Sequence, residues 1–420
     1  MLRKGWRHRI MIREKNDNRV LSAEGPSRKQ RLQLAVILGA IATIGPLSID
    51  MYLPALPELG KHFGTSAALV QLSLTFFLLG LASGQLVAGP LSDVHGRRRP
   101  LLIGMLIYTV SSLLCAFSPS IGLLVVLRFI QGLAGSVGVV ISRAAVRDLY
   151  SGSELTKFFS LLMIVNGLGP IFAPILGGQL LRVTTWQGVF IVLFCAGLLF
   201  CATILLRLPE TLPKERRVRS GLRGTLRTFR GLLGNGQFMG YALSQGFVTA
   251  AMFAYISGSS FVLQNMFGVS PQMYSLIFAV NGFGIILTGQ IAGRMSGRFG
   301  ERKLLASGLA LSTLGGVLLL ITVLAGGGLL LILICLFAVV SSVGLVSTTS
   351  FSLAMQDQGE SAGSASALLG LLPLLLGGCV APLVGLGGDE TAVPMAIVIA
   401  VAGLCSILSY LLLCRKGDRR

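Results

Sequence analysis

Long apolar stretches follow one another along almost the whole chain. Stretches of about 18 to 25 residues recur a dozen times, separated by short polar segments. A helix of this length crosses a hydrocarbon core about 30 Å thick. The predicted spans are residues 32–54, 68–92, 100–117, 121–143, 158–181, 186–207, 237–264, 271–292, 303–325, 327–350, 363–385 and 392–414. The pattern therefore predicts an all-α integral membrane protein with twelve transmembrane helices.

The composition agrees with a membrane protein. Of the 420 residues, 53% are hydrophobic and 12% are charged, whereas a soluble domain carries about 25% charged residues. Thirty-one polar and basic residues precede the first span, which is also too long for the apolar core of a signal peptide. We therefore expect a retained span. The seven cysteines lie in apolar runs without metal-ligand spacing, so no metal or other cofactor is expected.

The distribution of basic residues predicts the topology. The net charge is +19, and alternate loops divide the basic residues into thirty-two on one side and two, Lys61 and Arg182, on the other. This bias predicts that both termini lie in the cytoplasm. The protein itself is expected in the cell inner membrane. We expect the basic tail to contact anionic lipid rather than nucleic acid. The expected domains are a tail (1–31), a six-helix bundle (32–207), a basic linker (208–236), a second bundle (237–414) and a tail (415–420).

The two halves repeat one design. "GPLSDVHGRRR" from Gly89 corresponds to "GRMSGRFGERK" from Gly293, 204 positions later. In the fifth span Gly169, Ala173 and Gly177 recur at every fourth residue, and the eleventh span repeats this spacing 208 positions later. Small residues at this spacing form a groove where helix backbones approach closely, and Pro174 bends the helix. Tight packing and a role in gating both fit this pattern.

These segments resemble the major facilitator superfamily. "GPLSDVHGRRRP" resembles its loop signature, through Asp93, Gly96, Arg97 and Arg98, and "LRFIQGLAG" its fourth-span motif. "GLGPIFAPILGG" resembles the fifth-span antiporter motif, which includes Pro170 and has Ala173 where glycine is usual. "PLSIDMYLPALP", "ISRAAVRDLY", "FAYISGSSFVLQ" and "SAGSASALLG" are similar to the Bcr/CflA branch of bicyclomycin and chloramphenicol exporters. The resemblance implies a proton-coupled exporter of small, chemically varied drugs. We expect the protein to be a monomer.

Asp50 stands alone as an acidic residue well inside a predicted span. It has three interpretations: an ion pair with Arg128, an interfacial residue that reaches headgroup water, or a carboxyl group that exchanges protons while Arg128 approaches and withdraws. The resemblance favours proton coupling by Asp50 with Arg128. Alternatively, Arg128 caps helix carbonyls and binds Gln131 across the bundle.

Gating and cargo residues are predicted with similar alternatives. Asp93 and Arg97 lie where a solvated charge cluster is usual, whereas the resemblance implies a latch in which Asp93 pairs with the neighbouring bundle. Gly96 is expected to supply a tight turn. Five residues are candidates for contact with a neutral or weakly polar cargo, although packing is the usual role of such side chains. They are Tyr52, Phe253, Tyr255, Gln264 and Asn281.

Other functions have less support. The chain has no HExxH, GxSxG or ATP-binding GxxxxGK[ST] motif, so we expect a transporter driven by an ion gradient rather than an enzyme. An importer that moves a metabolite together with a proton would have the same fold. A membrane sensor that transports nothing would need a soluble domain, and the longest polar segments of about thirty residues are too short for one.

Overall fold

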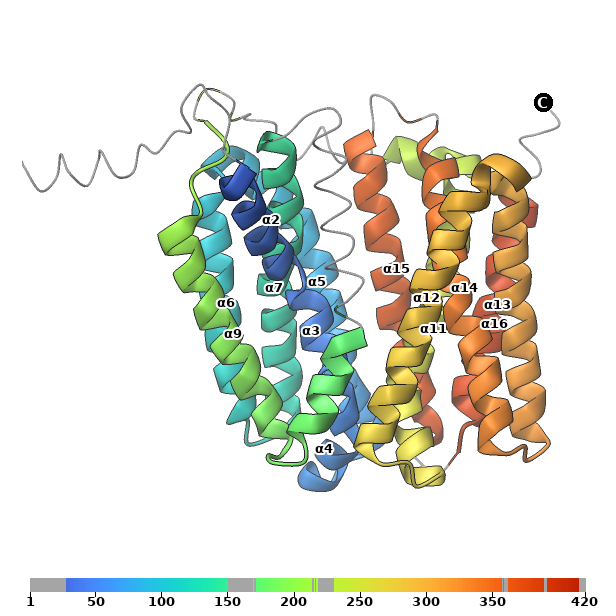
Figure 1. Cartoon of the computed structure of the whole chain (residues 1–420). Coiled ribbons are helices and arrows are strands. Elements are labelled where there is room, and N and C mark those ends of the chain that lie inside the picture. Colours follow the sequence, from blue (N-terminus) through green and yellow to red (C-terminus); the bar gives the residue numbers. More distant parts are fainter. Residues whose placement is uncertain are drawn as a thin grey trace, which may run out of the picture.

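The computed structural model describes residues 28–149, 169, 171–213, 215, 217, 230–356, 358, 362–388 and 391–414. Within these ranges the structure is helical and contains no strand. Figure 1 shows two groups of helices side by side, one coloured from blue to green and the other from yellow to red. The all-α prediction is confirmed.

The first group is built from the N-terminal half of the chain. Its elements are α2 (Arg28–Ala42), α3 (Ile44–Asp50), η1 (Leu53–Ala55), α4 (Leu56–Phe63), α5 (Ala67–His95), α6 (Arg98–Ala116), α7 (Ile121–Leu149), a short helix Ile171–Leu180 and α9 (Trp186–Arg207). The second group contains α11 (Gly236–Phe261), η3 (Val262–Met266), α12 (Pro271–Phe299), α13 (Glu301–Leu324), α14 (Leu329–Met355), α15 (Ala362–Val384), η4 (Gly385–Gly387), α16 (Val393–Ser409) and η5 (Tyr410–Cys414).

Eleven helical segments of the described residues are long and apolar enough to cross a membrane. The fifth predicted span, residues 158–181, is represented by the helix Ile171–Leu180, and most of its first part lies outside the described residues. The twelve predicted spans therefore match the eleven long segments and this shorter apolar helix.

The first span is longer and less regular than predicted. It extends to Phe63 instead of ending near residue 54, and it breaks after Asp50, where α3 gives way to a turn and the short 3₁₀ helix η1. Pro54 lies in η1 and cannot donate an amide hydrogen bond to an earlier carbonyl, which disfavours a continuous α-helix here. The break places Asp50 at the end of a helical segment in the interior of the protein.

The fourth span also differs from the prediction. The helix α7 continues to Leu149, so Arg143 lies inside the helix rather than at the start of a loop. The prediction that this span ends at Arg143 is therefore wrong. The sequence "RAAVRDL" has no proline or glycine that would stop a helix.

The repeat is visible in matching local geometry. Both α5 and α12 have 29 residues, and Ser66 and Ser270 cap their first turns by accepting hydrogen bonds from Leu69 N and Met273 N. The glycines that flank these helices have matching backbone angles. Gly64, Gly96, Gly268 and Gly300 have φ angles of 57°, 88°, 64° and 81°, respectively. Because L-residues with a side chain rarely adopt such angles, glycine is required at both ends of the repeated unit.

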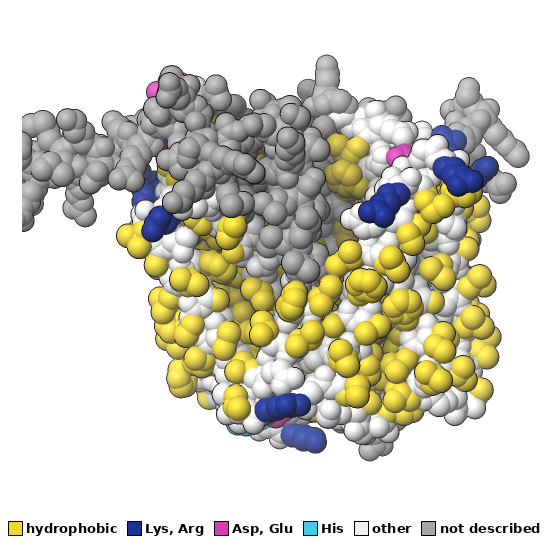
Figure 2. Space-filling model, in the orientation of Figure 1, with side chains coloured by type: hydrophobic (Ala, Val, Ile, Leu, Met, Phe, Trp, Pro, Cys, Tyr) yellow, Lys and Arg dark blue, Asp and Glu magenta, His cyan; other side chains and the backbone are white. Residues whose placement is uncertain are grey.

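The outer surface of the helices is apolar, as a lipid-facing surface requires. Figure 2 shows hydrophobic side chains over the middle of the molecule and basic side chains near its two ends. Leu199, Leu314 and Ile334 expose more than half of their surface on different helices. Such an apolar belt would be unstable in water and is what a surface in contact with lipid requires.

Candidate functional site

Arg128 of α7 is fully buried inside the first group of helices. Its Nη1 donates to Gln131 Oε1 at 2.7 Å, and its Nη2 donates to the carbonyl oxygen of Ser48 at 3.1 Å. The guanidinium carbon lies 4.2 Å from the ring centre of Phe77 and 4.8 Å from that of Tyr52. Aromatic faces attract a desolvated cation and replace part of its hydration. Arg128 therefore makes the two kinds of contact that the alternative interpretation expects, to a helix carbonyl of the first span and to Gln131, the latter within α7 itself rather than across the bundle.

The close approach of α5 and α7 positions this arginine. A Cβ atom at Gly132, one turn after Arg128, would overlap the carbonyl oxygen of Phe77 on α5. Glycine at position 132 therefore lets the two backbones touch. This contact brings the ring of Phe77 against the guanidinium group.

Asp50, the last residue of α3, is 5% exposed. Its carboxyl group interacts electrostatically with the phenol groups of Tyr255 and Tyr274 in the second group of helices. Within the described residues no hydrogen bond or ion pair of Asp50 is present. Asp50 therefore faces the other half of the molecule.

Asp50 and Arg128 do not form an ion pair in this conformation among the described contacts. They are connected through α3 instead, because Arg128 binds the carbonyl of Ser48, two residues before Asp50. The interfacial interpretation of Asp50 does not fit either, since this residue is buried and the span continues for thirteen residues to Phe63.

A polar cluster of the second half lies opposite Asp50. Asn281 Nδ2 donates to the hydroxyl oxygen of Tyr255 at 2.8 Å, and the ring of Tyr255 stacks on Phe278 at 5.5 Å. The hydroxyl of Tyr274 lies 3.2 Å from Ser259 Oγ. The structure thus brings together two predicted cargo residues, Tyr255 and Asn281, and places them near Asp50.

The other three predicted cargo residues lie elsewhere. The hydroxyl of Tyr52 is 2.8 Å from Ser73 Oγ inside the first group of helices. Phe253 packs so closely on α15 that a Cβ at Gly377 would overlap its ring. Gln264 donates to the carbonyl oxygen of Pro54 at 3.3 Å, between the two halves. The five residues therefore do not line one common site in this conformation.

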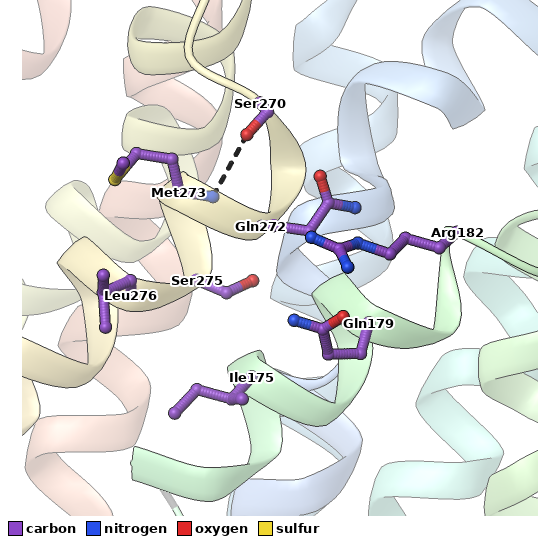
Figure 3. A pocket seen from close by; sticks show the side chains of 8 residues that line it. All are labelled: Ile175, Gln179, Arg182, Ser270, Gln272, Met273, Ser275 and Leu276. Atoms are coloured by element: carbon purple, nitrogen blue, oxygen red, sulfur yellow. Dashed lines mark hydrogen bonds between the residues drawn. The ribbon is translucent and has the colours of Figure 1, made fainter.

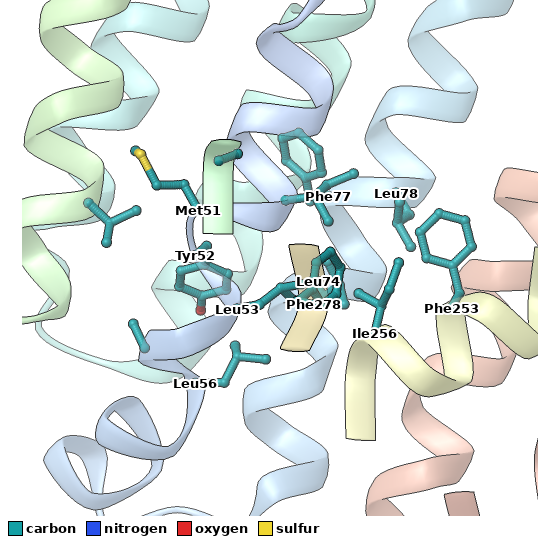
Figure 4. Close-up of a cluster of buried hydrophobic side chains, with 14 of the residues drawn as sticks. Met51, Tyr52, Leu53, Leu56, Leu74, Phe77, Leu78, Phe253, Ile256 and Phe278 are labelled. Atoms are coloured by element: carbon teal, nitrogen blue, oxygen red, sulfur yellow. The ribbon is translucent and has the colours of Figure 1, made fainter. Parts of the chain in front are cut away.

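The two halves are joined at the end of the molecule that carries α4, which we call the α4 face. Two glutamine amides cross between them: Gln71 Nε2 donates to Ser257 O at 3.1 Å and Gln272 Nε2 to Gly178 O at 2.8 Å. Figure 4 shows a buried apolar cluster with residues of both halves, among them Leu53, Leu74, Leu78, Phe253, Ile256 and Phe278. The α4 face is therefore closed in this structure.

The fifth-span motif packs against the first span. A Cβ at Gly177 would overlap the carbonyl oxygen of Met51, the residue after Asp50, whereas a Cβ at Gly169 would meet Pro46 Cβ at 3.4 Å. Ala173 and Pro174 are buried, and Pro170 lies outside the described residues. The small residues of the fifth span thus let it pack closely against the broken first span, which carries Asp50.

A charge cluster occupies the opposite end of the first half. Arg97 pairs with Asp93 and Asp148, both at 2.7 Å. Burial lowers the pKa of Arg97, but the hydrogen bonds to Asp148 and Asp93 outweigh it and raise this pKa above its ordinary value. In the part of the chain that the structure describes, Asp93 pairs with Arg97 of its own bundle, so the latch to the neighbouring bundle stays a prediction.

The start of the linker is fixed to the same cluster. Glu210 accepts hydrogen bonds from the backbone amides of Arg97 at 2.8 Å and Arg98 at 3.3 Å. These amides begin α6, where a negative charge is favoured by the helix dipole. A Cβ at Gly96 would lie 2.5 Å from Glu210 Oε2, so glycine permits this contact as well as the tight turn.

Sequence reasoning missed several of these residues. Gln71, Tyr108 and Tyr274 are polar groups in apolar spans, which is the signal that could have identified them. The hydroxyl of Tyr108 lies 2.6 Å from Ser48 Oγ and so supports the same turn of α3 that Arg128 binds. The role of Glu210 had no comparable signal, because it lies in a polar linker.

Two packed groups of helices, with polar groups buried where they meet, define a multi-pass membrane transporter. The sequence model of the Major Facilitator Superfamily matches residues 38–382, and the chain belongs to this superfamily. The family resemblance of the motifs is thereby confirmed.

Two relatives match this chain over most of its length, and one solved structure shares its fold. A Bacillus subtilis (strain 168) protein named an uncharacterized MFS-type transporter, YdgK, is 47% identical over 387 residues, which is 92% of this chain and 96% of the relative. A bicyclomycin resistance protein homolog of Haemophilus influenzae is 30% identical over 390 residues, 93% of this chain and 98% of the relative. The structure of a bacterial homolog of the lysosomal transporter Spinster matches the fold with a TM-score of 0.72 at 16% identity, over 93% and 98% of the two chains.

Proposed function

We propose that this protein exports small, neutral or weakly polar drugs in exchange for protons, by alternate opening of its two faces. The relative named for bicyclomycin resistance supports the drug as cargo. The basic loops support a cytoplasmic location for both termini, which makes the α4 face the outer one. The structure would then represent a state closed to the outside.

The observation that carries this proposal is the position of Asp50. Its carboxyl group is buried between the halves, near Tyr255 and Tyr274 and without a cationic partner in the described part of the chain. An ionised carboxylate buried in this way costs several kcal/mol. We therefore propose that the outer face closes over Asp50 after a proton has bound from outside.

The remaining steps follow from the same site. Opening towards the cytoplasm hydrates Asp50, so the proton leaves as cargo binds near Tyr255 and Asn281. The proton and the drug then occupy the site in turn. A pH difference of one unit supplies about 1.4 kcal/mol per proton, which biases the cycle about tenfold.

Energised everted vesicles test this proposal. Addition of a drug should release protons from the lumen if the two are exchanged, whereas an importer that carries both together would move them in the same direction. Asp50→Asn should abolish the drug-induced proton release and resistance to the drug. Glu58→Gln, on α4 of the same span, is the matched control and should keep both. Proton coupling retained by Asp50→Asn would exclude this mechanism.

A further inference from the structure

A pocket of about 370 Å³ lies at the seam between the two halves on the α4 face. One wall is the helix Ile171–Leu180 with the turn that follows it, and the other is the first turns of α12. In Figure 3, Arg182, Gln272 and Ser270 lie at the end nearer the loops, and Ile175 lies at the opposite end. Met273 and Leu276 lie on the other side of the pocket from Arg182 and Gln179, so one side of the pocket is polar and the other is apolar.

The polar side of the pocket is suited to an anion. Arg182 supplies a guanidinium group, and within the described residues this group has no carboxylate partner. Gln179 and Ser275 add an amide and a hydroxyl to the lining. Arginine recognises phosphate with two parallel hydrogen bonds. A single cation among neutral polar groups matches a ligand with one negative charge.

The apolar side of the pocket continues into the lipid-facing surface. Met273 and Leu276 line the pocket and are 52% and 53% exposed. Leu176 and Val280, 55% and 51% exposed, extend this surface along the same two helices towards the membrane centre. An acyl chain can follow these side chains while its headgroup stays beside Arg182.

The pocket depends on the closed α4 face. Gly178 accepts the hydrogen bond from Gln272, and a Cβ at Gly178 would overlap Ser275 Oγ, so the two walls touch at the base of the pocket. Separation of the halves on this face would remove one wall. A ligand held here therefore favours the closed conformation.

We propose that this pocket binds an anionic phospholipid, with its phosphate on Arg182 and an acyl chain along Met273 and Leu276, and that the lipid stabilises the conformation closed at the α4 face. The site is separate from Asp50 and needs no assumption about the cargo. The anionic-lipid content of the membrane would then set how often the protein adopts the conformation closed at the α4 face.

Native mass spectrometry of the full-length protein tests the site. Phosphatidylglycerol should remain bound to the parent, whereas Arg182→Gln should bind it about fivefold more weakly, since one basic residue near an anionic surface contributes about 1 kcal/mol. Arg182→Lys keeps the charge but not the two parallel hydrogen bonds, so its binding should lie between that of the parent and that of Arg182→Gln. Lys61→Gln, the matched control on the same face outside the pocket, should bind like the parent. Equal binding by Arg182→Gln and the parent would overturn the proposal.

Two further ligands distinguish an anionic lipid from a neutral lipid and from a free anion as the occupant of the pocket. Phosphatidylcholine, which has no net charge, should be lost from the parent at the same collision energy. Inorganic phosphate at a matched concentration should not displace phosphatidylglycerol. Retention of phosphatidylcholine would show that charge is not recognised, and displacement by phosphate would show a simple anion site; either result would exclude the lipid assignment.

Discussion

Arg128 donates a hydrogen bond to the carbonyl oxygen of Ser48 at 3.1 Å, and this carbonyl lies two residues before Asp50. The guanidinium group thereby holds the broken first span from within its own bundle, while Asp50 faces the other bundle. A shift of α3 relative to α7 would break this hydrogen bond and change the position of Asp50 relative to Arg128. Arg128 is in this sense a positioning residue for Asp50.

Arg128→Lys should weaken the attachment of α3 to α7 and so disturb the position of Asp50. An ammonium group keeps the charge but cannot reproduce the planar fork that reaches Gln131 and Ser48 while it lies on Phe77. We expect the free energy of unfolding to fall by about 1–2 kcal/mol and drug-driven proton exchange to fall at least about tenfold. Thermal unfolding and vesicle transport measure the two effects.

The control for this variant is Arg147→Lys, on an exposed part of the same helix. It should behave like the parent. Normal transport by Arg128→Lys would mean that charge alone is needed at position 128.

The fifth-span motif gives a second prediction with an internal control. Gly177→Ala introduces a Cβ into the space of Met51 O and should force the fifth span away from the residue after Asp50. Overpacking of this kind costs about 1–3 kcal/mol. Gly169→Ala, in which the new Cβ would meet Pro46 at 3.4 Å, should be tolerated. Thermal stability and transport of the two variants should differ clearly, and equal behaviour would contradict the close contact.

Glu210→Gln tests the attachment of the linker. The substitution removes the negative charge at the start of α6, although one oxygen can still accept a hydrogen bond from Arg97 or Arg98. A charge at a helix N-terminus contributes about 0.3–1 kcal/mol. The loss should appear as a lower unfolding temperature that becomes less distinct at high salt.

Glu215→Gln is the control for this charge effect. Glu215 lies five residues further along the linker and is exposed, so its substitution should leave the unfolding temperature unchanged. The same shift in both variants would indicate a general effect of net charge rather than a specific contact.

The sequence predicts the helical fold well because membrane spans are encoded locally. Apolar runs of the required length identify the helices, and the repeat relates Gly64 to Gly268 and Gly96 to Gly300. The break in the first span is harder to predict, since prolines are tolerated in membrane helices and their effect depends on neighbours. The extension of the fourth span to Leu149 likewise depends on interactions beyond the apolar run.

The site is only partly encoded in local sequence. Arg128 and Asp50 are conspicuous because charged residues are rare in apolar spans. Gln131, one turn from Arg128, is a partner that helical spacing predicts. The hydrogen bond from Arg128 to Ser48 and the electrostatic interaction of Asp50 with Tyr274 join segments that are far apart along the chain, and they depend on how the helices pack.

The closed α4 face leads to a final prediction. Gln71 Nε2 donates to Ser257 O across the two halves, and Gln71→Leu removes this bond while it keeps a similar side-chain volume. A hydrogen bond contributes about 0.5–1.5 kcal/mol. The fraction of molecules in which the halves are separated at the α4 face should therefore rise about two- to tenfold. Lys61 and Leu386 are both exposed on this face. Spin labels on cysteines introduced at these two positions report the distance between the halves by double electron–electron resonance.

This measurement needs a background in which the exposed Cys195 and Cys379 are replaced. Gln187→Leu is the matched control, because the side chain of Gln187 contacts Thr185 within its own half. A longer distance should appear in Gln71→Leu and not in Gln187→Leu, and added phosphatidylglycerol should restore the shorter one. If the distance distribution of Gln71→Leu equals that of the parent, the apolar cluster of Figure 4 is sufficient to close this face.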